Sequence, residues 1–242
     1  MTQVFAARPR SCCSSAIDFT TRQMVQTRAL TKMKNHRVYM LNRSKRSSEG
    51  VCLLVINSQE AEECVLLSVA RLMAVSARTA PKGRGVDRIV TAIVTGEEKE
   101  RIAQAMEKKT EQKKNPLPFF KRDAENLRRS PVVLLIGVKG TVPKRPEDPF
   151  NCGACGHTSC AEFIEAEKRN GEDFTGPICI FEAIDLGIAL GSAVKLASEL
   201  NIDNRVMYTI GAGAKALGML DADVIIGIPL SASGKSIYFD RK

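Results

Sequence analysis

Three cysteines fall within ten residues of the stretch NCGACGHTSC, residues 151–160, and a fourth follows at a distance. The four are spaced C-x2-C-x4-C-x18-C, at Cys152, Cys155, Cys160 and Cys179. Two thiolates separated by two residues can bind one metal centre if the backbone between them turns tightly, and Gly153 and Gly156 permit such a turn. If all four cysteines bind one metal centre, the fold brings Cys179 back to the cysteine loop.

The cysteine spacing favours one cofactor but leaves others open. Four thiolates bind either zinc or a [4Fe-4S] cluster, and the ligand type alone does not separate them. Structural zinc sites usually show two C-x2-C pairs, whereas three clustered cysteines with a remote fourth are typical of ferredoxin-like sites. A [4Fe-4S] cluster is the prediction, a structural zinc site is the alternative, and disulfides are disfavoured because nothing marks the chain as exported.

Cys179 stands near the start of a long apolar segment, ICIFEAIDLGIALGSAVKLASELNI. This segment predicts a helix that is hydrophobic over most of its circumference and therefore central in the fold. The start of a helix favours negative charge, which suits a thiolate. Asp185 is unusual within such a helix, and we expect its carboxylate to be paired or functional.

Helices and strands alternate along the rest of the chain. Asn57 and Glu60 predict a capping box at the start of the first helix, and one face of that helix is expected to be buried. That face comprises Val65, Leu66, Val69, Leu72 and Met73. Further helices are predicted over 96–114 and about 120–129, and buried strands over 86–94, 131–140 and 221–230. The pattern predicts one α/β or α+β layered domain over residues 55–242.

Residues 1–54 differ from the rest in composition. Residues 1–50 hold ten Lys or Arg and two Asp or Glu, which is +8 of the chain's net charge of +9. This Arg-rich and Ser-rich head predicts disorder. A start codon assigned too far upstream is the favoured explanation, with Met40 or Val55 as the true start, and an organellar transit peptide is the alternative.

The remaining residues argue against two classes of partner. Their charge is nearly balanced and their few aromatics are not interleaved with basic residues, so we expect no nucleic-acid binding. No apolar run reaches the length of a membrane span, so we expect no membrane insertion and a cytoplasmic protein.

Two other motifs have ordinary explanations. GAGAKA, residues 211–216, fits a dinucleotide-binding pattern, but Ser231 stands where that pattern needs an acidic residue, so a glycine-rich helix start is expected. His157 could donate a hydrogen bond to a cluster or act as a ligand, and an exposed turn residue is the alternative. No catalytic residue can be assigned from the sequence.

The segment NCGACGHTSCAEFIEA resembles the iron-sulfur motif of the corrinoid iron-sulfur protein large subunit and of ferredoxin-like subunits in membrane electron-transport complexes. Over residues 55–242 the chain also resembles a prokaryotic family of ferredoxin-domain-containing proteins. That resemblance is carried by SARTAPKGRGVDRI, NCGACGHTSC and DLGIALGSAVKLASELNIDNRV.

A third resemblance concerns the scaffold. Three segments are similar in layout to nitroreductases. They are SVARLMAVSARTAPKGRGVDRIVTAIVTGEEKERIAQA, DLGIALGSAVKLASELNI and the later GMLDADVIIGIPL. This resemblance implies an α+β homodimer that binds a flavin such as FMN. The Arg-rich segment that binds the flavin phosphate in those enzymes has no counterpart between Val55 and Glu63. Arg78, Lys82 and Arg84 are the cations that could replace it, and solvated loop cations are the alternative.

These patterns together predict an iron-sulfur redox protein on a nitroreductase-like α+β scaffold. Cys152, Cys155, Cys160 and Cys179 would hold one [4Fe-4S] cluster and pass single electrons. The electrons would go to a redox partner protein, to a small-molecule acceptor, or to a flavin in the same chain, which would make the chain an oxidoreductase.

Overall fold

A computed structural model describes residues 56–112 and 117–239. The predictions about the basic head, including a transit peptide or an upstream start, lie outside these ranges. So do Cys12, Cys13 and Cys52.

The chain forms six α-helices and six strands within the described ranges. The helices are α1 (Ser58–Thr79), α2 (Gly96–Gln112), α3 (Phe119–Arg129), α4 (Cys160–Glu165), α5 (Ile180–Glu199) and α6 (Tyr208–Ala216), and a 3-10 turn, η1, spans Gly83–Gly85. The strands are β1 (Ile89–Thr95), β2 (Val132–Val138), β3 (Arg169–Asn170), β4 (Thr175–Gly176), β5 (Asp203–Asn204) and β6 (Val224–Ser231).

The main sheet has the strand order β1-β2-β6-β5, and every neighbouring pair is antiparallel. Strands β3 and β4 form a separate short hairpin. Helices packed on an antiparallel sheet define an α+β fold, so the predicted class is confirmed. The hairpin and β5 are too short to leave a periodic signal in the sequence, and neither was expected.

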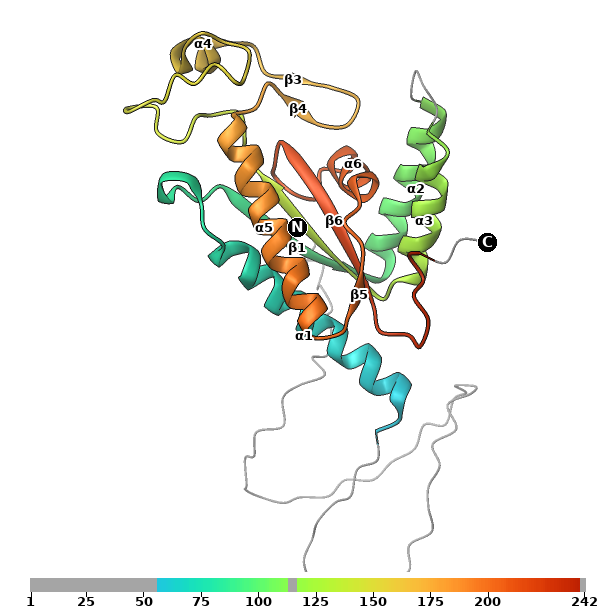
Figure 1. Cartoon of the computed structure of the whole chain (residues 1–242). Coiled ribbons are helices and arrows are strands. Elements are labelled where there is room, and N and C mark those ends of the chain that lie inside the picture. The colour runs from blue at the N-terminus through green and yellow to red at the C-terminus, as the bar shows by residue number, and fades with distance from the viewer. Residues whose placement is uncertain (1–55, 113–116, 240–242) are drawn as a thin grey trace, which may run out of the picture. The chain divides into compact units, whose positions relative to one another are not determined.

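Strand β2 lies at the centre of three layers. All seven of its residues are buried, as the continuous apolar run predicts. Because successive side chains of a strand point to opposite faces, Leu134 and Ile136 join the core beneath α1 and α5, whereas Val133 and Leu135 join the core beneath α2, α3 and α6. Figure 1 shows the two helix layers on either side of the sheet.

Helix α1 begins as predicted but buries a narrower face. The Asn57 side chain accepts a hydrogen bond of 2.9 Å from the Glu60 N–H, which confirms the cap. Leu66, Val69 and Met73 are buried, but Val65 and Leu72 are 42% and 52% exposed, so that part of the prediction is wrong. The buried stripe also contains two alanines, Ala70 and Ala77, which the prediction did not include.

Helix α5 is an outer helix, contrary to the prediction that it is central. Its small residues, such as Ala189 and Ala193, are fully buried, while Ile184 and Ile188 are 48% and 40% exposed. Apolar residues therefore lie on two faces of α5. One face packs on the sheet, and the other is exposed. No helix in the described part of the chain is long and apolar enough to cross a bilayer. The homodimer stays a prediction.

The GAGAKA segment, predicted as a helix start, instead forms the last six residues of α6, because the helix begins at Tyr208. It lies against β6. A Cβ added at Gly211 would lie 1.7 Å from the Ile225 carbonyl oxygen, and one at Gly213 would lie 2.9 Å from the Met106 side chain. Glycine at 211 therefore lets the helix approach the strand backbone directly.

We predict that Gly211→Ala lowers the free energy of unfolding by about 3 kcal/mol, because the clash is with backbone that cannot turn aside. Gly187→Ala is the matched control, since nothing lies within 4 Å of the added Cβ in α5. It should raise stability by about 0.5–1 kcal/mol. Chemical denaturation of both variants measures this, and an unchanged midpoint for Gly211→Ala would show that α6 does not need this close approach.

Candidate metal centre

The cysteines come from two segments that meet at the start of α5. Cys152 and Cys155 lie in the loop before α4, Cys160 is the first residue of α4, and Cys179 is the N-cap of α5. All four are free thiols. Figure 1 shows the cysteine loop and α4, in yellow, beside the end of α5 where that helix begins.

The cysteine loop turns at the two glycines, as predicted. Gly153 and Gly156 have φ values of 74° and 88°, in the left-handed region that favours glycine. The Gly156 N–H donates to the Gly153 carbonyl at 3.0 Å and closes the turn. The Asn151 side chain accepts from the Cys160 N–H at 2.8 Å, so the two ends of the loop are joined.

A capping box that the sequence analysis missed fixes the start of α4. The Ser159 hydroxyl accepts from the Glu162 N–H at 3.2 Å, and the Glu162 carboxylate accepts from the hydroxyl and the N–H of Thr158. These hydrogen bonds from Thr158 lower the pKa of Glu162. The Ser-x-x-Glu pattern within SCAE could have predicted this cap.

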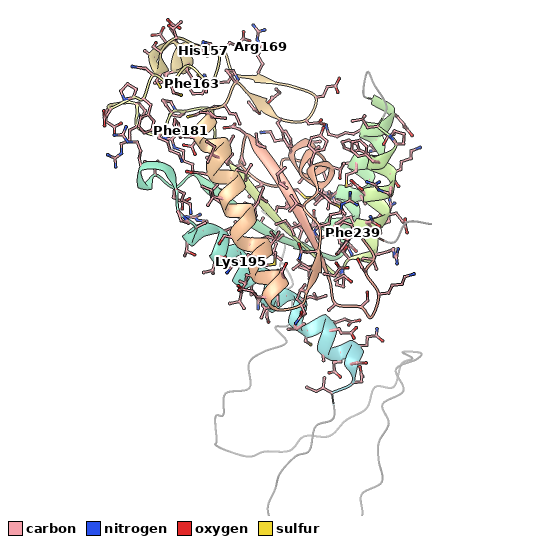
Figure 2. The ribbon with its side chains drawn as sticks, viewed as in Figure 1. His157, Phe163, Arg169, Phe181, Lys195 and Phe239 are labelled. Carbon is pink, nitrogen blue, oxygen red and sulfur yellow. The ribbon has the colours of Figure 1, made fainter. Side chains whose placement is uncertain are left out.

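Three of the four cysteines line one cavity. Cys152, Cys160 and Cys179 face it, together with the aromatic pair Phe150 and Phe181, whose ring centroids are 4.8 Å apart. Figure 2 shows Phe181 where the cysteine loop meets α5. The space open to a water-sized molecule is only about 10 Å³.

The geometry of the cysteines is not yet that of a bound metal. Cys155 is not among the residues that line the cavity. Within residues 56–112 and 117–239, no three His, Cys, Asp or Glu side chains are gathered closely enough to hold a metal ion. The structure thus brings three of the predicted ligands to one place, and does not bring the fourth.

Cys179 is the most enclosed of the four cysteines, with 8% of its surface exposed. Its N–H donates to the Gly140 carbonyl at 2.8 Å, which ties α5 to the segment leading from β2 to the cysteine loop. The unpaired N–H groups at the start of α5 favour negative charge there, as expected for a thiolate ligand.

A buried cluster of charges lies at the first turns of α5, next to Cys179. The Lys144 ammonium pairs with Glu182 at 2.8 Å and with Asp185, and it also donates to the Val86 carbonyl at 3.1 Å. None of these three charged side chains is more than 3% exposed. Lys144 thereby joins the linker before the cysteines to α5 and to the segment after η1.

The carboxylates of this cluster have further partners. Asp185 accepts from the Gly83 N–H at 3.0 and 3.1 Å, so the expectation that it is paired is confirmed. Arg88 lies 3.6 Å from Glu182 and donates to the Val142 carbonyl at 2.7 Å. Burial raises the pKa of Glu182, and Lys144 and Arg88 oppose that rise.

The three cations expected to bind flavin phosphate have protein partners. Arg78 pairs with Asp87 at 2.9 Å and Lys82 lies 3.8 Å from the same residue. The Lys82 ammonium also donates to the carbonyls of residues 77, 78 and 80, where α1 ends. Arg84 instead lines the cysteine cavity. The structure therefore does not bring these three cations together around one space.

His157 is half-buried in the cysteine loop. Its ring lies 6.0 Å from that of Phe163, a fully buried residue of α4, at a tilted angle. Figure 2 shows the two side chains together at the α4 end of the molecule. Packing on Phe163 is thus an ordinary role for His157, and a role toward a metal stays a prediction.

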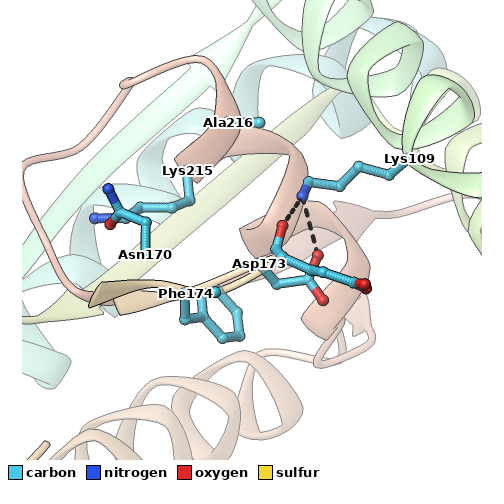
Figure 3. A pocket seen from close by; sticks show the side chains of 8 residues that line it. Lys109, Asn170, Asp173, Phe174, Lys215 and Ala216 are labelled. Atoms are coloured by element: carbon cyan, nitrogen blue, oxygen red, sulfur yellow. Dashed lines mark hydrogen bonds and ion pairs between the residues drawn. The ribbon is translucent and has the colours of Figure 1, made fainter. Parts of the chain in front are cut away.

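A second, larger pocket lies away from the cysteines, between the β3–β4 hairpin, α2 and α6 (Figure 3). Its volume is about 340 Å³. Lys109, at its edge, pairs with Asp173 at 3.0 Å, and Lys215 donates to the Ala222 carbonyl at 2.6 Å. Both ammonium groups are therefore already engaged by the protein.

Comparison with known proteins assigns the family. Residues 175–241 match the model of a family described as "Uncharacterized protein containing a ferredoxin domain (DUF2148)". A protein of Archaeoglobus fulgidus, described as uncharacterized, is 52% identical over 190 residues, which cover 78% of this chain and 98% of that protein. This chain belongs to that ferredoxin-domain family. The matched residues of the family model include Cys179 and exclude the three cysteines of the loop.

Solved structures with a similar arrangement include flavoproteins. An FMN-bound nitroreductase from Desulfitobacterium hafniense is 14% identical, with 70% of this chain and 79% of that chain covered and a TM-score of 0.45. A BluB-like flavoprotein from Clostridium difficile is 17% identical, with 72% and 84% covered and a TM-score of 0.44. These similarities concern the path of the backbone and not the binding of flavin.

The buried charge cluster was only half visible in the sequence. Asp185 stood out because it interrupts an apolar helix, and Glu182 could have been noticed for the same reason. Lys144 gave no signal, since it lies in KRPEDP, a charged segment that is typical of exposed linkers.

We predict that Lys144→Met lowers the free energy of unfolding by about 3–5 kcal/mol at neutral pH, because two buried carboxylates lose their cation. Burial holds the pKa of Glu182 above its ordinary value of 4.5, so the folded state binds its proton more readily than the unfolded state. The loss of unfolding free energy caused by Lys144→Met should therefore become smaller as the pH falls toward 4.5. Denaturation curves at several pH values measure it.

Lys139→Met is the matched control for this prediction. Lys139 lies in the same linker and pairs with Asp221, whose side chain is 92% exposed, so its loss should leave stability nearly unchanged. Equal effects of the two substitutions would mean that the Lys144 cluster contributes no more than a surface ion pair.

Proposed function

We propose that Cys152, Cys155, Cys160 and Cys179 hold one [4Fe-4S] cluster and that the chain transfers electrons through it. The observation that carries this proposal is that cysteines from two separate segments line a single cavity. Membership of a family described by its ferredoxin domain supports it.

The donor set fits such a cluster by its chemistry, and three of the four thiols already line one cavity. Four free thiols within one loop and one adjoining helix N-terminus are the ligands that iron-sulfur clusters use. The fit requires movement, since the cavity is small and Cys155 must turn toward it. The two left-handed glycines on either side of Cys155 give this part of the loop the freedom to do so.

When bound, a thiolate-held [4Fe-4S] cluster supplies one-electron chemistry. The chain's own residues position the ligands. The Gly140 carbonyl fixes the backbone of Cys179, and Asn151 fixes Cys160 relative to the start of the loop. Phe150 and Phe181 give the cavity one apolar wall.

A flavin site is not part of this proposal. Arg78 and Lys82 share Asp87, and Arg84 reaches the cysteine cavity instead of a common phosphate site. FMN binding stays a prediction, as do the homodimer and an electron acceptor that is a partner protein or a small molecule. The sample that tests the cluster also tests for flavin.

We predict that protein purified without oxygen contains about four irons and four sulfides per chain and bleaches on reduction. Cys→Ser at any of the four positions should lower cluster content severely, because each thiolate binds one corner. Absorption spectra with assays for iron, sulfide, zinc and released flavin on one sample provide the measurement.

Cys64→Ser is the matched control. Cys64 lies on α1, outside the cysteine loop, and its replacement should leave the iron content unchanged. A colourless protein with one zinc per chain would replace the redox function with a structural zinc site. Full cluster content in Cys179→Ser would remove that residue from the ligand set.

A further inference from the structure

Arg84 has a backbone conformation that non-glycine residues rarely adopt. Its φ and ψ are 56° and 15°, and it lies between Gly83 and Gly85 in η1. Such a conformation persists only where surrounding contacts hold it, and it is often found where a side chain must be placed for function. The contacts are present: Asp185 accepts from the Gly83 N–H, and Arg145 donates to the Arg84 carbonyl at 3.1 Å.

This conformation directs the Arg84 side chain to the cysteine loop. The guanidinium lies 4.7 Å from the centroid of the Phe150 ring and donates to the carbonyl and the carboxylate of Asp148. Phe150 is two residues before Cys152. The side chain of Arg84 is 20% exposed, and it lines the cavity that three of the cysteines line.

The charges around this cavity are mostly positive. Arg84, Lys144 and Arg145 line it, against one carboxylate, Asp148. Lys144 is balanced by its two buried carboxylates, as described above. Asp148 is 69% exposed, so water screens its charge more than it screens that of Arg84. Arg84 is therefore a largely enclosed cation at the cavity whose carboxylate partner is exposed to water, whereas Arg145 is itself exposed.

We propose that Arg84 sets the reduction potential of the iron-sulfur cluster by placing an enclosed positive charge at the cysteine cavity. The inference rests on the proposed function. Reduction by an external one-electron donor adds one negative charge to the site and releases no atom from it. A nearby cation stabilises that extra charge and raises the potential.

Arg84→Gln and Asp148→Asn separate this effect from loop anchoring. Both substitutions break the same ion pair, so a structural role alone would shift the potential in the same direction or not at all. The electrostatic role makes the shifts opposite. We expect Arg84→Gln to weaken reduction about tenfold, or about 59 mV for one electron, and Asp148→Asn to strengthen it by a smaller factor.

The measurement is a dithionite titration with redox mediators, followed by absorption and by electron paramagnetic resonance. Arg84→Lys, which keeps the charge, should shift the potential less than Arg84→Gln. Unchanged potentials, or shifts of the same sign in Arg84→Gln and Asp148→Asn, would overturn the inference. If Arg84→Gln loads no cluster, a higher potential in Asp148→Asn supports the inference and an unchanged one overturns it. Absence of iron from the wild-type protein would instead overturn the proposed function, and this inference with it.

Discussion

The ammonium of Lys144 joins three parts of the chain that are far apart in sequence. It pairs with Glu182 and Asp185 on α5 and donates to the carbonyl of Val86, just after η1. The first turns of α5, the linker and η1 then have one arrangement in which every buried charge has a partner. Burying such a cluster is costly, so its contribution is to fix these segments relative to one another more than to add net stability.

The candidate metal centre follows from that arrangement. Cys179 stands three residues before Glu182, and Cys152 follows the linker that carries Lys144. Fixing Lys144 against α5 thus brings the two cysteine-bearing segments together, and the hydrogen bond from Cys179 to Gly140 reinforces this. The Gly83 N–H, held by Asp185, fixes the turn that places Arg84 at the same cavity. One buried cluster therefore positions both the ligands and the neighbouring charge.

The sequence predicted those features that depend on neighbouring residues. The Asn57 cap, the fully buried β2 and the glycine turns of the cysteine loop are local, and the structure contains each of them. It was less predictable which face of a helix is buried and which side chains pair with one another. Val65 was assigned to the interior by helical periodicity and α5 by its apolar circumference, yet burial depends on which face meets the sheet.

The same limit applies to the candidate site. The four cysteines were identified by their spacing, because thiol chemistry is specific. The partners of Arg78, Lys82 and Arg84 were not identifiable, since a cation pairs with whichever carboxylate the fold brings near it. Arg78 proved to lie in the last turn of α1, and not in a loop as expected. Asp87 is near in sequence, whereas Asp148 is 64 residues from Arg84. Contacts of that range become visible only in the folded chain.

The central claim is that four thiols from two segments bind one cluster. A crystal structure of the protein purified without oxygen, with anomalous data at the iron absorption edge, tests it most directly. The account predicts four iron positions bonded to the sulfurs of Cys152, Cys155, Cys160 and Cys179, with Cys155 turned into the cavity. A single metal ion, or iron bound without Cys155 or Cys179, would contradict it.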